Sequence, residues 1–282
     1  MTACLFVSDL HGRADRYRKL FGEIAGARPG AVFIGGDIMP HHCNPDSPED
    51  FLRGCVLDGL EDLRGRLGGE FPRVFTILGN DDARWAEEPL EEASRQGLLS
   101  YLHGRGESFG RWTVYGYSYV PPTPFRLKDW ERYDVSRHVD PGCVSPEEGA
   151  HSTPFSPDEV RYATIQDDLR ELTKSADPEN AVLLFHAPPY DTDLDRAALD
   201  GIEIDHVPLD VHIGSIAVRR FIESFQPHLT LHGHVHESAR LTGSWRAVLG
   251  RTTALSAAHD GPELAVVRFD LEDPAGAVRE LL

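Results

Sequence analysis

The chain has 282 residues, of which 40% are hydrophobic and 26% are charged, as is typical of a globular protein with a large core. It contains no run of about 18 apolar residues, and its N-terminus begins a strand without a basic flank and a long apolar stretch, so we expect neither a membrane span nor a signal peptide. The net charge of −18 disfavours a nucleic-acid polymer as substrate, because nucleic-acid-binding proteins gain most affinity from Lys and Arg on phosphates.

Apolar runs and apolar residues at helical spacing alternate along the chain. In chain order they predict a strand over residues 5–7, a helix over 13–25, a strand over 31–34, a helix over 47–67 and a strand over 74–78. After a long segment they predict a helix over 158–175, a strand over 181–185, a helix over 215–225, and strands over 229–231, 245–249 and 264–269. This alternation predicts an α/β layered fold, and without a clear boundary we expect a single domain over residues 1–282.

The four cysteines are scattered along the chain and form no C-x-x-C pair: Cys4, Cys43, Cys55 and Cys143. This spacing favours free thiols, and we expect a cytoplasmic protein. Ser47 is a candidate N-cap before Pro48 at the start of the second predicted helix.

Residues that bind metals through nitrogen or oxygen directly follow five of the predicted strands. They are Asp9 and His11, then Asp37, then Asn80, then His186, and finally His234 and His236. A rigid sheet holds the strand ends in place, and the loops after them let the side chains converge. Carboxylate and amide oxygens mixed with imidazoles suit Mn²⁺, Fe or Zn²⁺. Asp37 is the natural bridge, since two cations roughly 3.5–4 Å apart need a shared anion between them.

This ordered set, which runs from the sequence Ser-Asp-Leu-His-Gly at residues 8–12 to His236, resembles the calcineurin-like metallophosphoesterase superfamily. The stretches 186–192, 213–215 and 233–238 resemble its Icc-related bacterial and archaeal phosphoesterases in particular. The resemblance implies an α-β-β-α sandwich, in which two mixed sheets pack together and helices flank them.

The resemblance also implies two divalent or trivalent metal ions, Mn, Fe or Zn. One ion takes Asp9, His11, Asp37 and His236, and the other takes Asp37, Asn80, His186 and His234. A hydroxide that bridges the two ions then attacks phosphorus in line with the leaving group. We therefore expect a dinuclear-metal-dependent phosphoesterase that hydrolyses a small phosphodiester or an activated phosphomonoester.

Asp81 departs from the family pattern, in which a His that assists the leaving group often follows the Gly-Asn pair. An unperturbed aspartate has a pKa of about 3.9, so Asp81 is a poor acid at neutral pH unless burial desolvates it. General acid catalysis is worth roughly 10²–10⁴-fold, so we expect diesters to be preferred to monoesters. Asp81 is still a candidate catalytic residue. Arg13 is another, because it opens a helix directly after the first ligands, although an ordinary surface arginine is the alternative.

Several other polar residues near these motifs have competing interpretations. We expect Asp82 to brace its loop through hydrogen bonds and His232 to be structural. Residues 214–215 begin a helix whose N–H groups suit an anion, but an ordinary N-cap is the favoured interpretation. His41 and His42 follow the second ligand motif and are weaker candidates for the cleft.

Residues 115–157 are rich in proline and aromatic residues and show little periodicity. A long segment of this kind inside a compact domain is usually functional or disordered. We interpret it as an insertion that packs beside the metal cleft and shapes substrate choice. A surface excursion without contact to the substrate is the alternative.

Two other functions compete with hydrolysis of a small phosphorylated substrate. One is a metal-binding scaffold of the same fold without catalysis, which Asp81 supports although all seven ligand types are present. The other is a nuclease, which the negative charge disfavours. Cyclic nucleotides are one substrate candidate by family resemblance. No apolar stripe is left over that must meet a partner, so the sequence predicts no particular oligomeric state.

Overall fold

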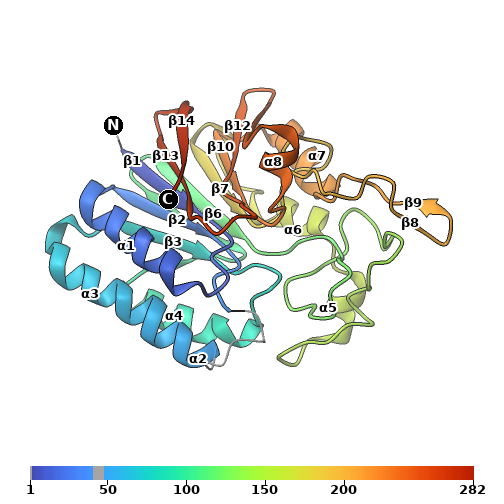
Figure 1. Ribbon diagram of the computed structural model, residues 1–282, viewed down its shortest axis with the longest axis horizontal. Coiled ribbons are helices and arrows are strands. Elements are labelled where there is room, and N and C mark those ends of the chain that lie inside the picture. The colour runs from blue at the N-terminus through green and yellow to red at the C-terminus, as the bar shows by residue number, and fades with distance from the viewer. Residues whose placement is uncertain (1, 41–47) are drawn as a thin grey trace.

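The computed structural model describes residues 2–40 and 48–282, which form two six-stranded sheets with helices outside them (Figure 1). The first sheet contains, in spatial order, β14 (Asp273–Leu281), β13 (Ala265–Asp270), β1 (Ala3–Val7), β2 (Ala31–Gly35), β3 (Arg73–Ile77) and β4 (Ser100–Tyr101). The second contains β11 (Arg246–Leu249), β12 (Thr252–Ser256), β10 (Leu229–His232), β7 (Ala181–Phe185), β6 (Trp112–Tyr117) and β5 (Arg105–Phe109). The predicted α-β-β-α sandwich is confirmed.

Both sheets are mixed, and their central strands are parallel. Strands β1, β2, β3 and β4 run in parallel, whereas β13 is antiparallel to β1 and β14 is antiparallel to β13. Strands β12, β10, β7 and β6 of the second sheet are also parallel, and β11 and β5 are antiparallel edge strands. Val7 pairs with Ile34 and Ile34 with Thr76, so the loops after β1, β2 and β3 leave the sheet at the same level.

The core lies on both faces of the central strands. Phe6, Phe33 and Phe75 fill the space between the sheets, where the rings of Phe33 and Phe75 stack with centroids 5.3 Å apart. The alternate residues of the same strands, such as Val7 and Ile34, belong to the core cluster that the helices share. Burial on both faces explains why these strands are continuous apolar runs rather than alternating ones.

The helices cover the outer faces of the two sheets. Helices α1 (Ala14–Ala27), α2 (Pro48–Phe51), α3 (Asp58–Leu67) and α4 (Glu87–Arg95) lie on the side of the first sheet, and α6 (Ile165–Leu172) and α7 (Ile216–Phe225) on the side of the second (Figure 1). A π-helical stretch, Leu52–Leu57, joins α2 to α3. The short α8 (Ser238–Thr242) follows the last predicted ligand, and β8 (Glu203–Ile204) and β9 (Val207–Pro208) form a separate hairpin.

Three parts of the sequence prediction need correction. The helix expected over residues 158–175 is two helices, α5 (Pro157–Tyr162) and α6, because Thr164 is extended and caps α6 by accepting a hydrogen bond from the Asp167 N–H. Residues 115–117, assigned to the proline-rich segment, complete β6. Strands β4, β5, β6, β8, β9, β12 and β14 and helices α4 and α8 were not predicted.

Some expectations concern residues outside those that the structure describes, namely Ser47 as an N-cap, Cys43, and His41 and His42. The thiols of Cys4, Cys55 and Cys143 are free, as expected. Among the described residues, no helix is long and apolar enough to cross a membrane.

Candidate metal centre

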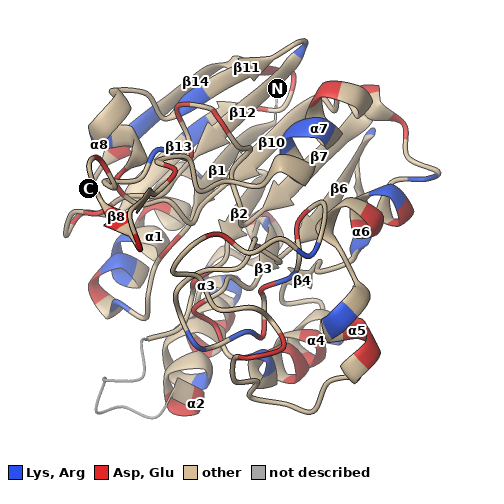
Figure 2. Ribbon diagram, turned by 90° about the vertical axis from the view of Figure 1, so that its right-hand side faces the viewer, with Lys and Arg blue, Asp and Glu red and all other residues tan. Residues whose placement is uncertain are grey.

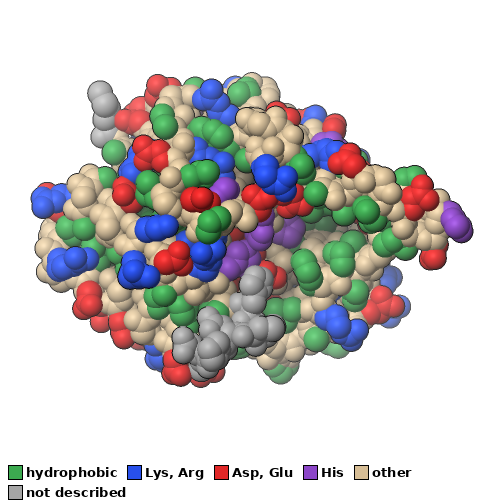
Figure 3. All heavy atoms as spheres, viewed as in Figure 1, with side chains coloured by type: hydrophobic (Ala, Val, Ile, Leu, Met, Phe, Trp, Pro, Cys, Tyr) green, Lys and Arg blue, Asp and Glu red, His purple; other side chains and the backbone are tan. Residues whose placement is uncertain are grey.

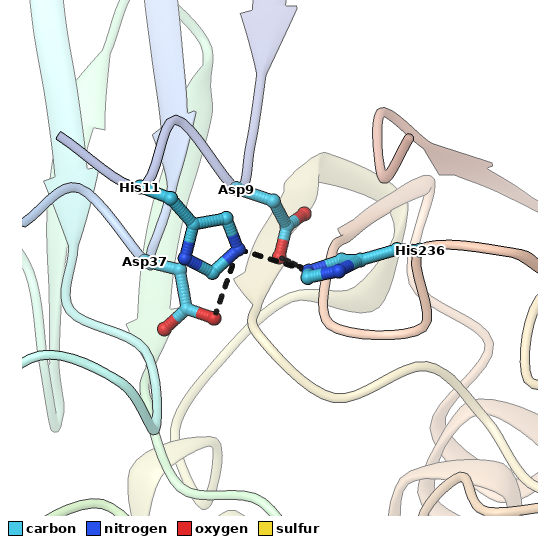
Figure 4. A group of neighbouring side chains, drawn as sticks. All are labelled: Asp9, His11, Asp37 and His236. Atoms are coloured by element: carbon cyan, nitrogen blue, oxygen red, sulfur yellow. Dashed lines mark hydrogen bonds and ion pairs between the residues drawn. The ribbon is translucent and has the colours of Figure 1, made fainter. Parts of the chain in front are cut away.

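Four predicted ligands converge where the parallel strands of the two sheets end (Figure 4). The ligand atoms of Asp9, His11, Asp37 and His236 all lie within 4.8 Å of one another. His11 Nε2 is 3.0 Å from His236 Nε2 and 3.8 Å from Asp37 Oδ2, and His236 Nε2 is 3.2 Å from Asp9 Oδ1. This is the set that the family resemblance assigns to one ion. Figure 3 shows histidine side chains gathered near the middle of this face of the molecule.

The other predicted ligands also lie beside Asp37 or next to one another. His186 Nε2 is 3.2 Å from Asp37 Oδ2 and 3.1 Å from Asn80 Oδ1. The ring of His234 lies beside that of His186, with centroids 5.3 Å apart. The backbone N–H of Asp81 donates to Asp37 Oδ1 at 2.9 Å, while Oδ2 faces the histidines. Oδ2 of Asp37 therefore lies within 3.8 Å of a histidine of each group, although the ligand role of all seven residues stays a prediction.

The backbone of the ligand loops is unusual. Asp9, His11, Asp37 and His234 have positive φ angles of 57°, 46°, 51° and 74°. Residues other than glycine adopt this left-handed conformation rarely, and such strain concentrates at functional sites. Backbone hydrogen bonds hold it in place: the Asp9 N–H donates to the Gly36 carbonyl, and the His11 N–H donates to the Asp37 carbonyl at 2.7 Å.

Neighbouring groups orient the ligands. Nδ1 of His186 lies 2.8 Å from the carbonyl oxygen of Gly35, which can only accept, so Nδ1 carries a proton and Nε2 is directed at the site. Asp82 is fully buried and accepts hydrogen bonds from the backbone N–H groups of Gly79, Ile38 and Met39 at 2.9, 3.1 and 2.8 Å. The expectation that Asp82 braces this loop is confirmed.

His232 contributes to packing rather than to the ligand group. Its ring is fully buried, stacks on Phe185, and lies 2.9 Å from the Ala187 carbonyl and 2.8 Å from Thr230 Oγ1. Burial lowers the pKa of His232 to about 4, so it is neutral at physiological pH. These contacts agree with the structural role expected for it.

The charges of the site compensate one another in the metal-free protein. Burial opposes charge on His186, but Asp37 raises the pKa of His186 to about 10. Burial likewise opposes charge on His236, and its hydrogen bond with Asp9 raises the pKa of His236 to about 9. The pKa of Asp9 falls to about 2 despite burial because of His236, and that of Asp37 is lowered by His186. A bound cation would take the place of these protons.

Asp81 lies at the edge of this group, with 23% of its side chain exposed and Oδ2 3.5 Å from His11 Nδ1. Burial, together with the charges of Asp37 and Asp82, raises the pKa of Asp81 to about 8. From the sequence we expected Asp81 to be ionised at neutral pH unless burial desolvated it. Without metal, burial does raise its pKa. Divalent cations beside Asp81 would lower its pKa again.

The donor set fits divalent metal ions. Oδ2 of Asp9 is buried, and no group in residues 2–40 and 48–282 forms a hydrogen bond with it. An unpaired buried carboxylate oxygen is costly, and a cation is the simplest partner for it among carboxylates and imidazoles. Mixed carboxylate, amide and imidazole donors are those that Mn²⁺, Fe and Zn²⁺ accept.

Two other sequence candidates, a catalytic arginine and a helix start that suits an anion, are not part of the ligand group. Arg13 is 41% exposed and pairs with Asp15, with Nε 3.4 Å from Oδ1, so its contact with a substrate stays a prediction. Ser215 is the N-cap of α7, and the N–H groups of Ile216 and Ala217 donate to the carboxylate of Asp134. The favoured N-cap interpretation is confirmed, and the anion at this helix end is an internal side chain that the sequence pattern did not reveal.

Comparison with known proteins places the chain among phosphoesterases. The family model described as calcineurin-like phosphoesterase matches residues 3–238. The uncharacterised protein MJ1162 of Methanocaldococcus jannaschii is 36% identical over 93 residues, which are 32% of this chain and 38% of that protein. The chain thus spans about two fifths of the curated relative that it matches.

Solved structures of similar fold cover nearly the whole chain. TT1561 of Thermus thermophilus is 15% identical with a TM-score of 0.58, over 99% of this chain and 98% of that one. A dimetal phosphatase from Danio rerio is 14% identical with a TM-score of 0.50, over 99% of this chain and 95% of that one. At these identities the likeness shows a shared fold.

Proposed function

The chain belongs to the calcineurin-like phosphoesterase family, and from this premise we propose that it uses two metal ions to hydrolyse a small phosphodiester or an activated phosphomonoester. The observation that carries the proposal is the position of Asp37. Its Oδ2 lies 3.8 Å from His11 Nε2 and 3.2 Å from His186 Nε2, so one carboxylate faces both ligand groups. A shared carboxylate of this kind is what a pair of neighbouring cations needs.

The predicted ligands would be shared between the two ions. Asp9, His11 and His236 would hold one ion and Asn80, His186 and His234 the other, with Asp37 between them. When bound, the ions polarise a phosphoryl oxygen and lower the pKa of water, which makes it a nucleophile at neutral pH. The printed name of the Danio rerio neighbour, a dimetal phosphatase, supports two ions.

Asp81 supports the preference for diesters. A phosphodiester carries one negative charge, whereas a phosphomonoester carries up to two. Near the metals Asp81 is an additional carboxylate 3.5 Å from His11, and its charge would repel the second charge of a monoester. It also supplies no imidazole to assist a poor leaving group.

The surface charge supports a small substrate. The net charge is −18, and Figure 2 shows both acidic and basic segments on α4, α5 and α6, where each helix has more acidic than basic residues. A polyanion would gain little from such a surface, whereas a small ester needs only the centre itself. Cleavage of single-stranded DNA faster than of a small diester would contradict this part of the proposal.

The deciding experiment compares bis-p-nitrophenyl phosphate with p-nitrophenyl phosphate, with Mn²⁺ and with a chelator. We expect Mn²⁺-dependent hydrolysis that is faster for the diester and is abolished by Asp37→Asn, because the bridging charge is lost. Asp62→Asn removes the same charge from the exposed face of α3 and should leave the rates unchanged. Folded wild type that turns over neither ester with any metal would instead indicate a metal-binding scaffold without catalysis.

A further inference from the structure

The segment of residues 118–156, between β6 and α5, contacts the loops that carry predicted ligands from both sheets (green in Figure 1). We call residues 129–134 within it the central link. A carboxylate lies at each end of the central link: Asp129, which is fully buried, and Asp134, which is half-buried. Neither is a predicted ligand, and each accepts hydrogen bonds from the backbone of a different part of the site.

Asp129 holds the loop that follows Asn80. Its side chain is fully buried, and Oδ2 accepts a hydrogen bond from the backbone N–H of Arg84 at 2.7 Å. The same carboxylate binds Ser152 through its backbone N–H at 2.8 Å and through its hydroxyl. The Arg84 guanidinium also lies over the ring of Trp130, 4.8 Å from its centroid. The loop between β3 and α4 is therefore fastened to the central link at its backbone.

Asp134 holds the region that follows His186. Its carboxylate accepts hydrogen bonds from Ser215 Oγ at 2.5 Å, from the Ile216 N–H at 2.7 Å and from the Ala217 N–H at 3.1 Å. Ser215 in turn donates its N–H to the Pro188 carbonyl at 2.9 Å, and the Tyr190 N–H donates to the Ser215 carbonyl at 3.0 Å. Pro188 is two residues after His186, so Asp134 is coupled to this ligand through Ser215.

The residues between these two anchors are themselves held firmly. Lys128 and Glu131 form a fully buried ion pair, and Glu131 also accepts a hydrogen bond from the Thr123 N–H at 2.6 Å. Arg132 donates its N–H to the Val120 carbonyl at 3.0 Å and its guanidinium to Asp168 at 2.6 Å. These contacts hold the backbone between Asp129 and Asp134 in one arrangement.

We propose that the central link is a brace that sets the spacing between the Asn80 loop and the His186 loop, with Asp129 and Asp134 as positioning residues for the metal ligands. The inference rests on the proposed function, because the loops that it positions are those of that site. Groups that orient metal ligands without touching the metal typically change metal affinity by about 10–100-fold when they are altered. The brace also explains why the proline-rich segment has little regular structure: its backbone follows the two loops.

The test uses Asp129→Asn and Asp134→Asn, which keep the shape but turn one acceptor oxygen of each side chain into an NH₂ donor. We expect Mn²⁺ titration followed by electron paramagnetic resonance to show about 10–100-fold weaker binding. In the metal-free protein, amide hydrogen exchange should accelerate at residues 79–86 for Asp129→Asn and at 186–192 and 215–218 for Asp134→Asn. Where Asp129→Asn does not fold, Ser152→Ala removes one hydrogen bond from Asp129 and should show the same pattern more weakly. Ser215→Ala does the same for Asp134, and it also removes the N-cap hydrogen bond from the Val218 N–H.

Asp270→Asn is the matched control, because Asp270 is a half-buried carboxylate that accepts hydrogen bonds from the backbone N–H groups of Thr2 and Glu272 at 3.2 and 2.9 Å, beside the start of β1. It should lower the melting temperature while Mn²⁺ affinity and exchange at residues 79–86 stay as in the wild type. Wild-type Mn²⁺ affinity in both Asp129→Asn and Asp134→Asn, or an equal loss in Asp270→Asn, would overturn the brace. Altered Mn²⁺ binding in Asp129→Asn and Asp134→Asn of a protein that hydrolyses no ester would contradict the proposed function and leave the brace standing.

Discussion

Asp81 occupies the position at which many relatives, by the resemblance noted in the sequence, carry a leaving-group histidine. Burial and two neighbouring carboxylates raise its pKa to about 8 in the metal-free protein. Cations at the adjacent ligands act in the opposite direction, because each positive charge favours the ionised carboxylate. With metal bound, Asp81 would therefore be an ionised carboxylate rather than a proton donor.

The consequence can be tested with Asp81→His. We expect the rate on an alkyl phosphate monoester to rise within the range of roughly 10²–10⁴-fold that general acid catalysis supplies, while an activated diester changes little. The measurement is kcat/KM for both esters with Mn²⁺. Asp81→Asn removes the charge without adding a donor. If it raised the monoester rate as much as histidine does, charge repulsion alone would explain the preference.

Asp82 joins the loop after β2 to the loop after β3 through backbone hydrogen bonds. It accepts hydrogen bonds from the N–H groups of Gly79, Ile38 and Met39, all of them buried. Asp82→Asn would aim an NH₂ group at one of these donors and leave it unsatisfied. We expect the free energy of unfolding to fall by about 2 kcal/mol. Urea denaturation in the presence of a chelator is the measurement, since a loss that appears only with metal would instead make Asp82 a ligand.

At the scale of elements, the turn after β3 leaves no room for a side chain. A Cβ on Gly79 would lie 2.3 Å from Asp37 Oδ1 and 2.6 Å from His186 Cε1. The loop carrying Asn80 thus approaches two ligands more closely than any residue but glycine allows.

Gly79→Ala should therefore displace the ligand loop and weaken Mn²⁺ binding by about tenfold or more, as altered ligand support does elsewhere. The control is Gly22→Ala in α1, where nothing lies within 4 Å of the added Cβ. That change should leave Mn²⁺ affinity intact and raise the free energy of unfolding by roughly 0.5–1 kcal/mol, because alanine favours a helix. Calorimetric Mn²⁺ titration of both variants distinguishes them; equal affinities would contradict the steric argument.

The central strands could be predicted because burial on both faces makes them continuous apolar runs, as in β2 and β7. Edge strands such as β14 lack that signal, since exposed and buried residues mix along it. The break between α5 and α6 depends on a distant partner, because the Tyr133 carbonyl accepts the Ile165 N–H. The grouping of Asp9, His11, Asp37 and His236 could be predicted because each residue follows a strand. Asp129 and Asp134 could not, since their partners lie far away in sequence.

At the scale of the whole molecule, the candidate centre joins the two sheets. Asp9, Asp37 and Asn80 follow strands of the first sheet, and His186 and His234 follow strands of the second. A cation held by both sets binds only when the sheets are packed, and the unfolded chain offers no such arrangement. Metal binding should therefore stabilise the entire fold and not only its loops.

Free Mn²⁺ at about 100 times its dissociation constant should add about 2.7 kcal/mol to the free energy of unfolding for each site that it fills. For a chain of this size, each filled site then raises the melting temperature by about 5 °C. Thermal unfolding with Mn²⁺ and with a chelator measures it, and Asp37→Asn should lose most of the rise because both ligand groups lose their shared carboxylate. Equal stabilisation of Asp37→Asn and wild type would mean that Mn²⁺ binds elsewhere. If the melting temperature of Asp37→Asn rose by about half as much as that of the wild type, one ion would still bind without Asp37. The two sites would then differ in their dependence on this carboxylate.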